Sequence, residues 1–397
     1  MADFIPPDRH AAVKRKGDTS GKEAAQVTSR VQARSNGHAN ARGISFGLAP
    51  ARGGELDPRG ANRRQAYAAL DLGTNNCRLL IARPSGENFT VIDAFSRVVR
   101  LGEGLAQTGR LPDQAMERAM SALNVCAEKL RRRNVHLARS VATEACRRAV
   151  NGAEFIERVR AETGIVLDII SAQEEARLAV LGCHVLLEQG PGPAIIFDIG
   201  GGSTELVLVE SGGAVPRILD WVSVPWGVVS LTDTVGRVDG TAAERQDRYA
   251  QMRSQVRASF AAFAQRIGAF AADADRIRLL GTSGTVTTLA SLHLELTQYD
   301  RQAVDGLIVP AQAMRTISRR LVGMRGEERR QVPCIGDDRA NLVVAGCAIL
   351  ESIMDIWPAE RLGVSDRGIR EGILRSLMAA DIRGRQHQAS LRDGKEG

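Results

Sequence analysis

AIIFDIGGGSTELVLV, residues 194–209, is the stretch that decides the fold. Two apolar runs flank the turn GGGST at residues 200–204. The pattern predicts two strands joined by a tight turn, in which backbone N–H groups converge on an anion because the glycines carry no side chains. A carboxylate stands at each edge of this turn, Asp198 and Glu205. Carboxylates beside a phosphate cradle suit Mg²⁺, so the stretch favours phosphate binding over an ordinary glycine turn.

The same pattern occurs a second time, earlier in the chain. Asp71-Leu72-Gly73 aligns without gaps with Asp198-Ile199-Gly200, at an offset of 127 positions, and apolar runs follow both turns in the same register. Each copy then continues with alternating strands and helices. The repeat predicts two similar α/β domains, at residues 66–190 and 194–364, with both glycine turns in a cleft between them.

Helical periodicity predicts several long helices, with strands between them. A C-terminal helix within residues 366–380 is expected to pack back on the first domain, and a frayed polar tail to follow at residues 382–397. The helices expected from periodicity lie at residues 112–133, 151–162, 173–187, 241–272, 284–294, 311–324, 339–356 and 368–379.

The net charge of +7 belongs mainly to the first 65 residues, which contain twelve Lys or Arg and six Asp or Glu. The rest of the chain is near neutral and the protein has 4% aromatic residues, so its composition argues against a core that binds nucleic acid. Residues 1–65 show no hydrophobic period and are predicted to form a disordered basic leader. Basic clusters such as residues 14–16 leave open a weak contact with a polyanion, although a solvated tail is favoured.

The cysteines and the apolar segments indicate in which cellular compartment the protein is located. The six cysteines are scattered without a CxxC pair, which is typical of reduced, buried thiols rather than of disulfides or a zinc site. No apolar segment approaches the roughly 18 residues of a membrane span, and Met1 is not followed by a secretory apolar region. We therefore expect a cytoplasmic protein that does not contact membranes.

A series of motifs runs in order from residue 68 to residue 378: AALDLGTNNCRLLIA, RLGEGL, VATEACRRA, ISAQEEARL, FDIGGGSTELVLV, LLGTSGTVTTLA, DDRANLVVAGCAIL and VSDRGIREGIL. Together they resemble the exopolyphosphatase and guanosine pentaphosphate phosphohydrolase (Ppx/GppA) family. The resemblance implies an α/β fold of two duplicated actin-like (ribonuclease H-like) domains facing a cleft, in the short two-domain form. Family members hydrolyse the terminal phosphoryl group of polyphosphate or pppGpp with Mg²⁺, and relatives often form homodimers.

The resemblance also implies roles for individual carboxylates. Glu175 matches the family's catalytic glutamate, which orients or deprotonates the attacking water. Glu174 is the alternative, about 100° away on the same predicted helix, and either carboxylate could instead complement the helix dipole. Asp198 and Glu205 match residues that position Mg²⁺, and Asp71 is their first-copy partner, expected to share the metal or its water shell.

The residues that the resemblance assigns to phosphate binding come from both turns and from two arginines: Gly73, Thr74, Asn75, Gly200, Gly201, Gly202, Ser203, Thr204, Arg147 and Arg339. Arginine suits this role because its guanidinium donates two hydrogen bonds at once. Arg100 is a third candidate arginine. Residues 281–285, GTSGT, correspond to the superfamily's nucleoside-side loop, and phosphate binding, guanosine binding and helix capping all stay open for them.

The leading hypothesis is a Mg²⁺-dependent exopolyphosphatase that releases orthophosphate from the end of inorganic polyphosphate. The alternative in the same class is a pppGpp 5′-phosphohydrolase. An ATP-dependent kinase would need an acceptor pocket and an adenosine loop, which we do not find in the sequence. A non-catalytic sensor of polyphosphate or nucleotide would not need Glu175, Asp198 and Glu205 together.

Overall fold

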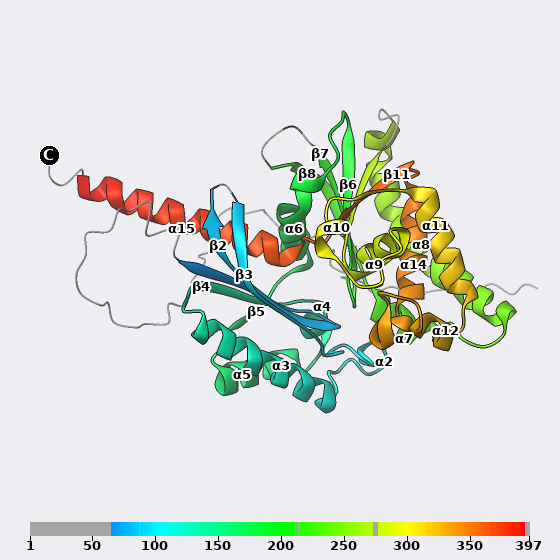
Figure 1. Cartoon of the computed structure of the whole chain (residues 1–397), viewed down its shortest axis with the longest axis horizontal. Helices are drawn as coiled ribbons and strands as arrows, with labels where there is room; N and C mark the ends of the chain where they lie inside the picture. Colours follow the sequence, from blue (N-terminus) through cyan, green and yellow to red (C-terminus); the bar gives the residue numbers. More distant parts are fainter. Residues whose placement is uncertain (1–64, 87, 211, 213–214, 273–276, 394–397) are drawn as a thin grey trace, which may run out of the picture. The chain divides into compact units, whose positions relative to one another are not determined.

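The computed structural model describes residues 65–393, except for residues 87, 211, 213–214 and 273–276. The predicted leader, apart from its last residue, and the end of the predicted tail lie outside the described residues. The described residues belong to one compact unit, residues 43–397. They form two β-sheets with helices packed on the sheet faces (Figure 1).

The first sheet has five strands in the order β3-β2-β1-β4-β5. Side chains alternate between the two faces of its central strand β1. Ala68 and Leu70 pack with helices α3 and α5, whereas Tyr67 and Ala69 pack with helices α6 and α15. The strands are β1 Ala66–Leu72, β2 Asn76–Ser85, β3 Asn88–Val98, β4 Val135–Ala142 and β5 Leu167–Ile169. The helices of this lobe are α2 Leu105–Thr108, α3 Asp113–Arg132, α4 Glu144–Arg148, α5 Gly152–Thr163, α6 Ala172–Cys183 and α15 Ile369–Asp393.

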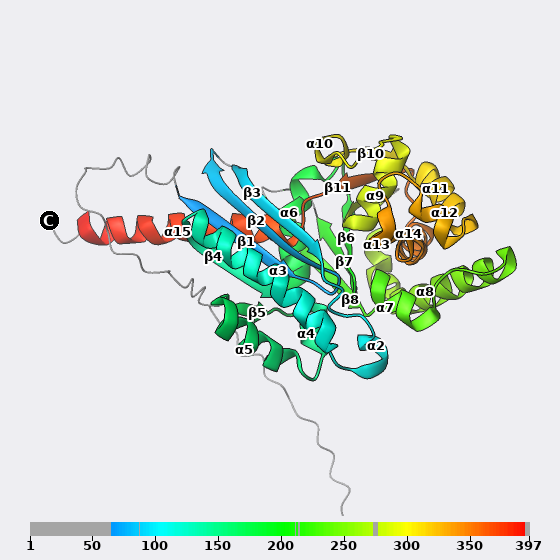
Figure 2. The ribbon, with the colours of Figure 1, turned by 60° about the horizontal axis from the view of Figure 1, so that its bottom comes forward.

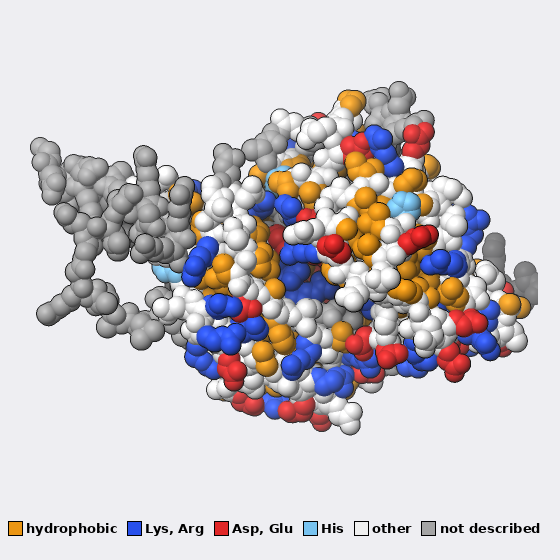
Figure 3. Space-filling model, in the orientation of Figure 1, with side chains coloured by type: hydrophobic (Ala, Val, Ile, Leu, Met, Phe, Trp, Pro, Cys, Tyr) orange, Lys and Arg blue, Asp and Glu red, His pale blue; other side chains and the backbone are white. Residues whose placement is uncertain are grey.

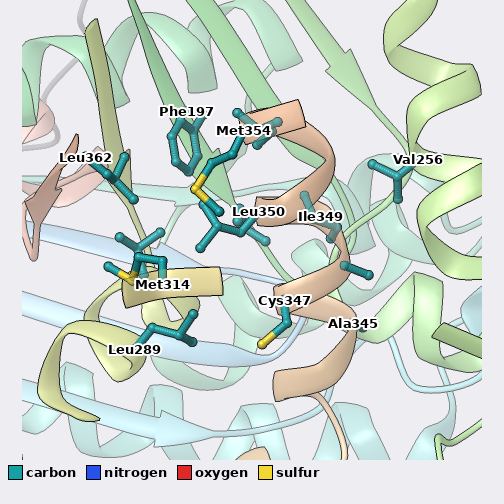
Figure 4. Packing of buried hydrophobic residues seen from close by; sticks show 14 of the residues in the cluster. Phe197, Val256, Leu289, Met314, Ala345, Cys347, Ile349, Leu350, Met354 and Leu362 are labelled. Carbon is teal, nitrogen blue, oxygen red and sulfur yellow. The ribbon is translucent and has the colours of Figure 1, made fainter. Parts of the chain in front are cut away.

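The second sheet has six strands in the order β10-β11-β9-β6-β7-β8. Its central strand β6 presents Phe197 to the largest hydrophobic core, where this ring lies beside Leu350 and Met354 of helix α14 (Figure 4). The strands are β6 Pro193–Ile199, β7 Thr204–Glu210, β8 Arg217–Val224, β9 Arg278–Thr282, β10 Ile308–Pro310 and β11 Arg361–Ser365. The helices are η1 His184–Leu186, α7 Val228–Val235, α8 Ala242–Ala272, α9 Gly284–His293, α10 Arg301–Val304, α11 Ala311–Gly323, α12 Gly326–Arg330, α13 Gly336–Ala340 and α14 Val343–Ile356.

The two sheets repeat one pattern, as the sequence offset predicts. Strand β6 pairs antiparallel with β7 and parallel with β9, just as β1 pairs with β2 and β4. The pairing register repeats as well. Asp71 lies opposite Arg78 in the first sheet, and the residues 127 positions later, Asp198 and Glu205, lie opposite each other in the second. The prediction of a duplicated α/β fold is therefore confirmed.

Helix α6 lies between the two sheets (Figure 2), and its apolar residues contribute to clusters on both. It crosses helix α15 at a point where the two backbones touch. A Cβ at Gly182 would overlap the carbonyl oxygen of Gly368, and a Cβ at Gly372 would overlap that of Leu178. Glycine is therefore required on both helices at this crossing.

Two predicted elements differ from the observed ones. Arg339 does not begin the long helix predicted at 339–356; it lies in the short helix α13, and a turn at residues 341–342 separates α13 from α14. Helix α15 continues to Asp393, where a frayed tail was predicted. Its extra turns are held to the first sheet by the hydroxyl of Tyr67, which donates to Asp381 at 2.6 Å.

The structure also describes the apolar helices and the cysteines. In the part of the chain that the structure describes, no helix has both the length and the apolar character needed to cross a membrane. All six cysteines are free and five of them are buried, as their spacing predicts.

Candidate active site

The two glycine turns close the hairpins β1–β2 and β6–β7 and line one cleft. The N–H groups of Gly73 and Gly200 each donate to the carbonyl oxygen three residues further on, at 2.9 and 3.0 Å. The turns lie against each other, since a Cβ at Gly202 would come within 2.7 Å of the hydroxyl oxygen of Thr74. Only glycine permits this approach. Figure 3 shows basic side chains gathered in a hollow near the middle of the molecular face.

Most residues assigned to phosphate binding line this cleft: Gly73, Thr74, Asn75, Gly200, Gly201, Gly202, Ser203 and Arg339. Thr204 does not, because it is buried and its hydroxyl donates to the carbonyl oxygen of Trp226 at 2.6 Å. Its role in the structure is to anchor the start of β7. In the loop at 281–285, Ser283, Gly284 and Thr285 line the cleft, whereas Gly281 packs against the ring of Phe197.

The carboxylates of Asp71, Asp198 and Glu205 line the cleft where the turns meet. Burial raises the pKa of Asp198 to about 6, with Arg78 opposing and Asp71 adding to the rise. Burial and the charge of Asp198 raise the pKa of Glu205 to about 7, although the hydroxyl of Ser223 donates to it at 2.7 Å. A cluster of like charges of this kind is stabilised by a cation.

Glu175 extends into the cleft wall from the first turn of helix α6. Its side chain is buried, and its Oε2 atom accepts a hydrogen bond from Nη1 of Arg147 at 3.0 Å. Burial and then the charge of Glu205 raise the pKa of Glu175 well above its usual value, while Arg147 opposes the rise. A buried carboxyl with a raised pKa is suited to act as a general base near neutral pH.

Glu174 lies on a different face of α6. Its carboxylate accepts hydrogen bonds from Arg139 at 2.9 Å and from Arg177 at 2.7 Å, and it does not line the cleft. The two neighbouring glutamates therefore have different surroundings, and only Glu175 lines the cleft in which a substrate would bind.

The predicted arginines occupy three different places. Arg339 lines the cleft and donates to the hydroxyl of Thr288 at 2.9 Å. Arg147 does not line the cleft; it lies behind Glu175. Arg100 forms an exposed ion pair with Asp338 of the second lobe at 2.6 Å and does not line the cleft.

Arg78 lines the cleft and was not among the predicted phosphate-binding residues. Its backbone is paired with the neighbouring strands, but its guanidinium makes no hydrogen bond or ion pair with another described residue. Burial and repulsion from Arg370 lower its pKa, and Asp71 opposes this effect. The signal in the sequence is that Arg78 takes, in the first copy, the place of Glu205 in the second. A guanidinium in a cleft without a protein partner is suited to bind a phosphate.

Arg78→Ala is expected to lower kcat/KM for a phosphate substrate by about 10- to 150-fold, since a hydrogen bond to a charged group contributes about 1.5–3 kcal/mol. The measurement is initial-rate kinetics at fixed Mg²⁺. Arg83→Ala is the matched control, because Arg83 lies on the same strand but is exposed. Equal kinetics for the two variants would exclude a substrate contact by Arg78.

The cleft carboxylates are candidate ligands for a divalent cation. Among residues 65–393 as described, no group of three or more His, Cys, Asp or Glu side chains is arranged to hold a metal ion. Mg²⁺ nevertheless needs few protein ligands, because it keeps water and takes oxygens from its substrate. The Oδ1 atom of Asp71 is buried without a hydrogen-bond partner, and Asp198 and Glu205 lie beside it in the cleft lining. These residues fit such a partly hydrated ion.

The raised pKa of Glu205 predicts a pH dependence of stability. Folding raises this pKa from 4.5 to about 7, so the folded protein binds the proton more tightly than the unfolded chain. The stabilisation is complete below about pH 4.5 and is lost as the pH rises through 7. In EDTA, the free energy of unfolding should fall by up to about 3 kcal/mol over this range, as measured by urea denaturation. In Glu205→Gln, the free energy of unfolding should change less with pH. The same pH dependence in both proteins would refute a raised pKa of Glu205.

A cleft walled by paired glycine turns and carboxylates, between two duplicated α/β lobes, defines a phosphate-handling protein with the actin-like two-domain fold. The model of the Ppx/GppA phosphatase family matches residues 80–380. The chain belongs to this family, and it is a hydrolase of the phosphoric anhydride type.

Individual relatives agree with this assignment. "Exopolyphosphatase 2" of Mycobacterium tuberculosis is 31% identical over 325 residues, which cover 78% of this chain and 98% of the relative. A "Putative exopolyphosphatase" of Haemophilus influenzae is 28% identical and covers 83% and 97% of the two chains. The solved Ppx/GppA family member from Aquifex aeolicus has a TM-score of 0.64 at 28% identity, covering 80% and 98%. An exopolyphosphatase from Cytophaga hutchinsonii has a TM-score of 0.71 at 23% identity, covering 80% and 98%, and shows the fold alone.

Proposed function

We propose that the chain is a Mg²⁺-dependent exopolyphosphatase, which hydrolyses the terminal phosphoryl group of inorganic polyphosphate and releases orthophosphate. The observation that carries this proposal is the position of Glu175. Its buried carboxylate lies in the wall of the same cleft as both glycine turns and is held by Arg147 at 3.0 Å. The relatives named as exopolyphosphatases support polyphosphate as the substrate.

In the proposed reaction, Glu175 orients a water molecule for in-line attack on the terminal phosphorus and accepts its proton. The water oxygen forms a bond to this phosphorus, and the bond from phosphorus to the bridging oxygen breaks. The bridging oxygen leaves with its electron pair on the shortened chain. The protein thus supplies positioning and charge rather than covalent chemistry.

The phosphate oxygens would be bound by the backbone N–H groups of the two turns and by the guanidinium groups of Arg78 and Arg339. Asp198 and Glu205, with Asp71 directly or through water, would hold Mg²⁺. When bound, the ion supplies positive charge that offsets the charge of the phosphoryl oxygens.

A second candidate is pppGpp 5′-phosphohydrolysis. The observation that favours it is that Leu342, Val343 and Ile369 add apolar surface to the cleft that Arg339 also lines. An apolar wall beside a cation can bind a nucleoside, whereas inorganic polyphosphate has no group that would use it.

The test is orthophosphate release from long-chain polyphosphate, pppGpp and ATP, each with and without Mg²⁺. Fast release from polyphosphate that requires Mg²⁺ is expected. Fast release from pppGpp alone would overturn the exopolyphosphatase proposal in favour of the second candidate. Phosphoryl transfer to an added acceptor would overturn both.

A further inference from the structure

A second cavity, of about 370 Å³, lies behind the cleft carboxylates. Its walls come from helix α4, the first turn of helix α6, and strand β8 with the residue that follows it. On its rim, Ala172 and Trp221 are half-buried and Pro225 is exposed, so the cavity opens to solvent. It has room for several water molecules, since one occupies roughly 30 Å³ in the liquid. We call it the rear cavity.

The rear cavity and the cleft share a thin wall. Glu144 lines both. Its Oε2 atom accepts a hydrogen bond from Nη2 of Arg147 at 2.9 Å, and Nη1 of the same arginine donates to Glu175 at 3.0 Å. One guanidinium therefore lies between the rear cavity and the carboxylate proposed to activate water.

Two hydroxyl groups complete this wall. Ser203, from the second glycine turn, lines both spaces. Ser223 lines the rear cavity and donates to Glu205 at 2.7 Å. Because the single hydrogen of the Ser223 hydroxyl is donated to Glu205, the oxygen of this hydroxyl can accept a hydrogen bond from a protonated phosphate oxygen.

The geometry of in-line attack determines which product forms near this wall. The attacking water and the departing chain lie on opposite sides of the phosphorus. In the reaction proposed above, the new orthophosphate would therefore form on the side of Glu175, and the shortened chain would lie on the other side. A chain that stays bound would occupy the front of the cleft, so the orthophosphate would need another exit.

We propose that the rear cavity is a product site, which takes orthophosphate from the active site and releases it while the polyphosphate chain stays in the cleft. The proposal rests on the exopolyphosphatase function proposed above. Arg147 is the cation that would bind the departing orthophosphate. Hydrogen bonds to Glu144, to Glu175 and to the carbonyl oxygen of Ile170 use three of its N–H groups. A guanidinium has five, so the described residues leave two for a phosphate.

The test is Ala172→Phe, which places a ring in the rear cavity from a residue that does not line the cleft. Orthophosphate formed on long-chain polyphosphate is measured by rapid quench, and orthophosphate released is measured with a fluorescent phosphate sensor. In the unmodified protein the two traces should coincide. In Ala172→Phe the first turnover should keep its rate, whereas release should become at least about tenfold slower, so that a burst of bound product appears before the sensor responds.

Gln173→Phe is the matched control, because Gln173 is the next residue on the same helix turn and is exposed outside the rear cavity. Its two traces should coincide. Ala172→Leu is the smaller replacement if the phenylalanine variant does not fold, and it should show a shorter lag. Tripolyphosphate should also reduce the lag, since its short product can leave through the front of the cleft.

Hydrolysis with coincident traces in the Ala172 variants would overturn the product site and leave the exopolyphosphatase function intact. An equal lag on tripolyphosphate and on long chains would also overturn it, because the lag would then not depend on a chain that occupies the cleft. Absence of orthophosphate formation from polyphosphate in the unmodified protein would overturn both proposals together.

Discussion

Glu175→Gln is expected to lower kcat for orthophosphate release by about 10²- to 10⁴-fold, the usual contribution of a general base. Glutamine keeps the size of the side chain and can still accept a hydrogen bond from Arg147, but it cannot take a proton from water. The KM for polyphosphate should change little, because the proposed phosphate contacts come from the turns and from Arg78 and Arg339. Steady-state kinetics at saturating Mg²⁺ provide the measurement.

Glu174→Gln is the matched control for this variant. It removes the same charge one residue away, from a carboxylate whose partners are Arg139 and Arg177. Partly exposed ion pairs of this kind contribute about 0–1 kcal/mol, so kcat should stay close to that of the unmodified protein. The reverse outcome, loss in Glu174→Gln with turnover kept in Glu175→Gln, would transfer the catalytic role to Glu174.

Asp198→Asn is expected to reduce activity at least about 100-fold at a fixed, subsaturating Mg²⁺ concentration and to raise the Mg²⁺ concentration needed for half-maximal rate. The reason is that an amide oxygen binds the ion less strongly than a carboxylate, and loss of the ion's charge stabilisation costs several kcal/mol of transition-state binding. The measurement is a Mg²⁺ titration of initial rates, paired with calorimetric Mg²⁺ binding in the absence of substrate.

Asp220→Asn is the control for the metal prediction. Asp220 lies on strand β8 and pairs with Arg266 at 3.0 Å at the surface, so its Mg²⁺ titration should match that of the unmodified protein. If Asp198→Asn keeps both its activity and its Mg²⁺ titration, the metal role of Asp198 is wrong.

The fold could be predicted to a large extent because its signals are local. A strand, a glycine turn and a second strand lie within one short stretch, and the repeat of this stretch at an offset of 127 positions places Asp71 and Asp198 at equivalent positions of two sheets. Apolar periodicity likewise predicts most helices. Helix ends were less predictable, because contacts such as that of Tyr67 with Asp381 at 2.6 Å extend α15 through tertiary packing that local sequence does not encode.

The candidate site was predictable where it consists of turn residues and less so elsewhere. Arg78 could be found only by aligning the two copies, in which it takes the place of Glu205, and its exposure to the cleft depends on the strand register. The hydroxyl of Thr204, conversely, belongs to the motif but is used by the carbonyl oxygen of Trp226. The rear cavity has no sequence signature at all, because α4, α6 and β8 are distant in the chain and meet only in the folded protein.

The glycine contact between helices α6 and α15 has a mechanical consequence. The chain passes from the first lobe to the second after α6 and returns before α15, so both connections run beside the crossing at Gly182 and Gly372. Rotation of the lobes would therefore pivot near this point, beside the apolar cluster that Leu178 of α6 and Ile373 of α15 share. Glu175 lies about two turns of helix from Gly182, close to such a pivot. A small rotation would thus open the cleft more at its mouth than at the carboxylate of Glu175.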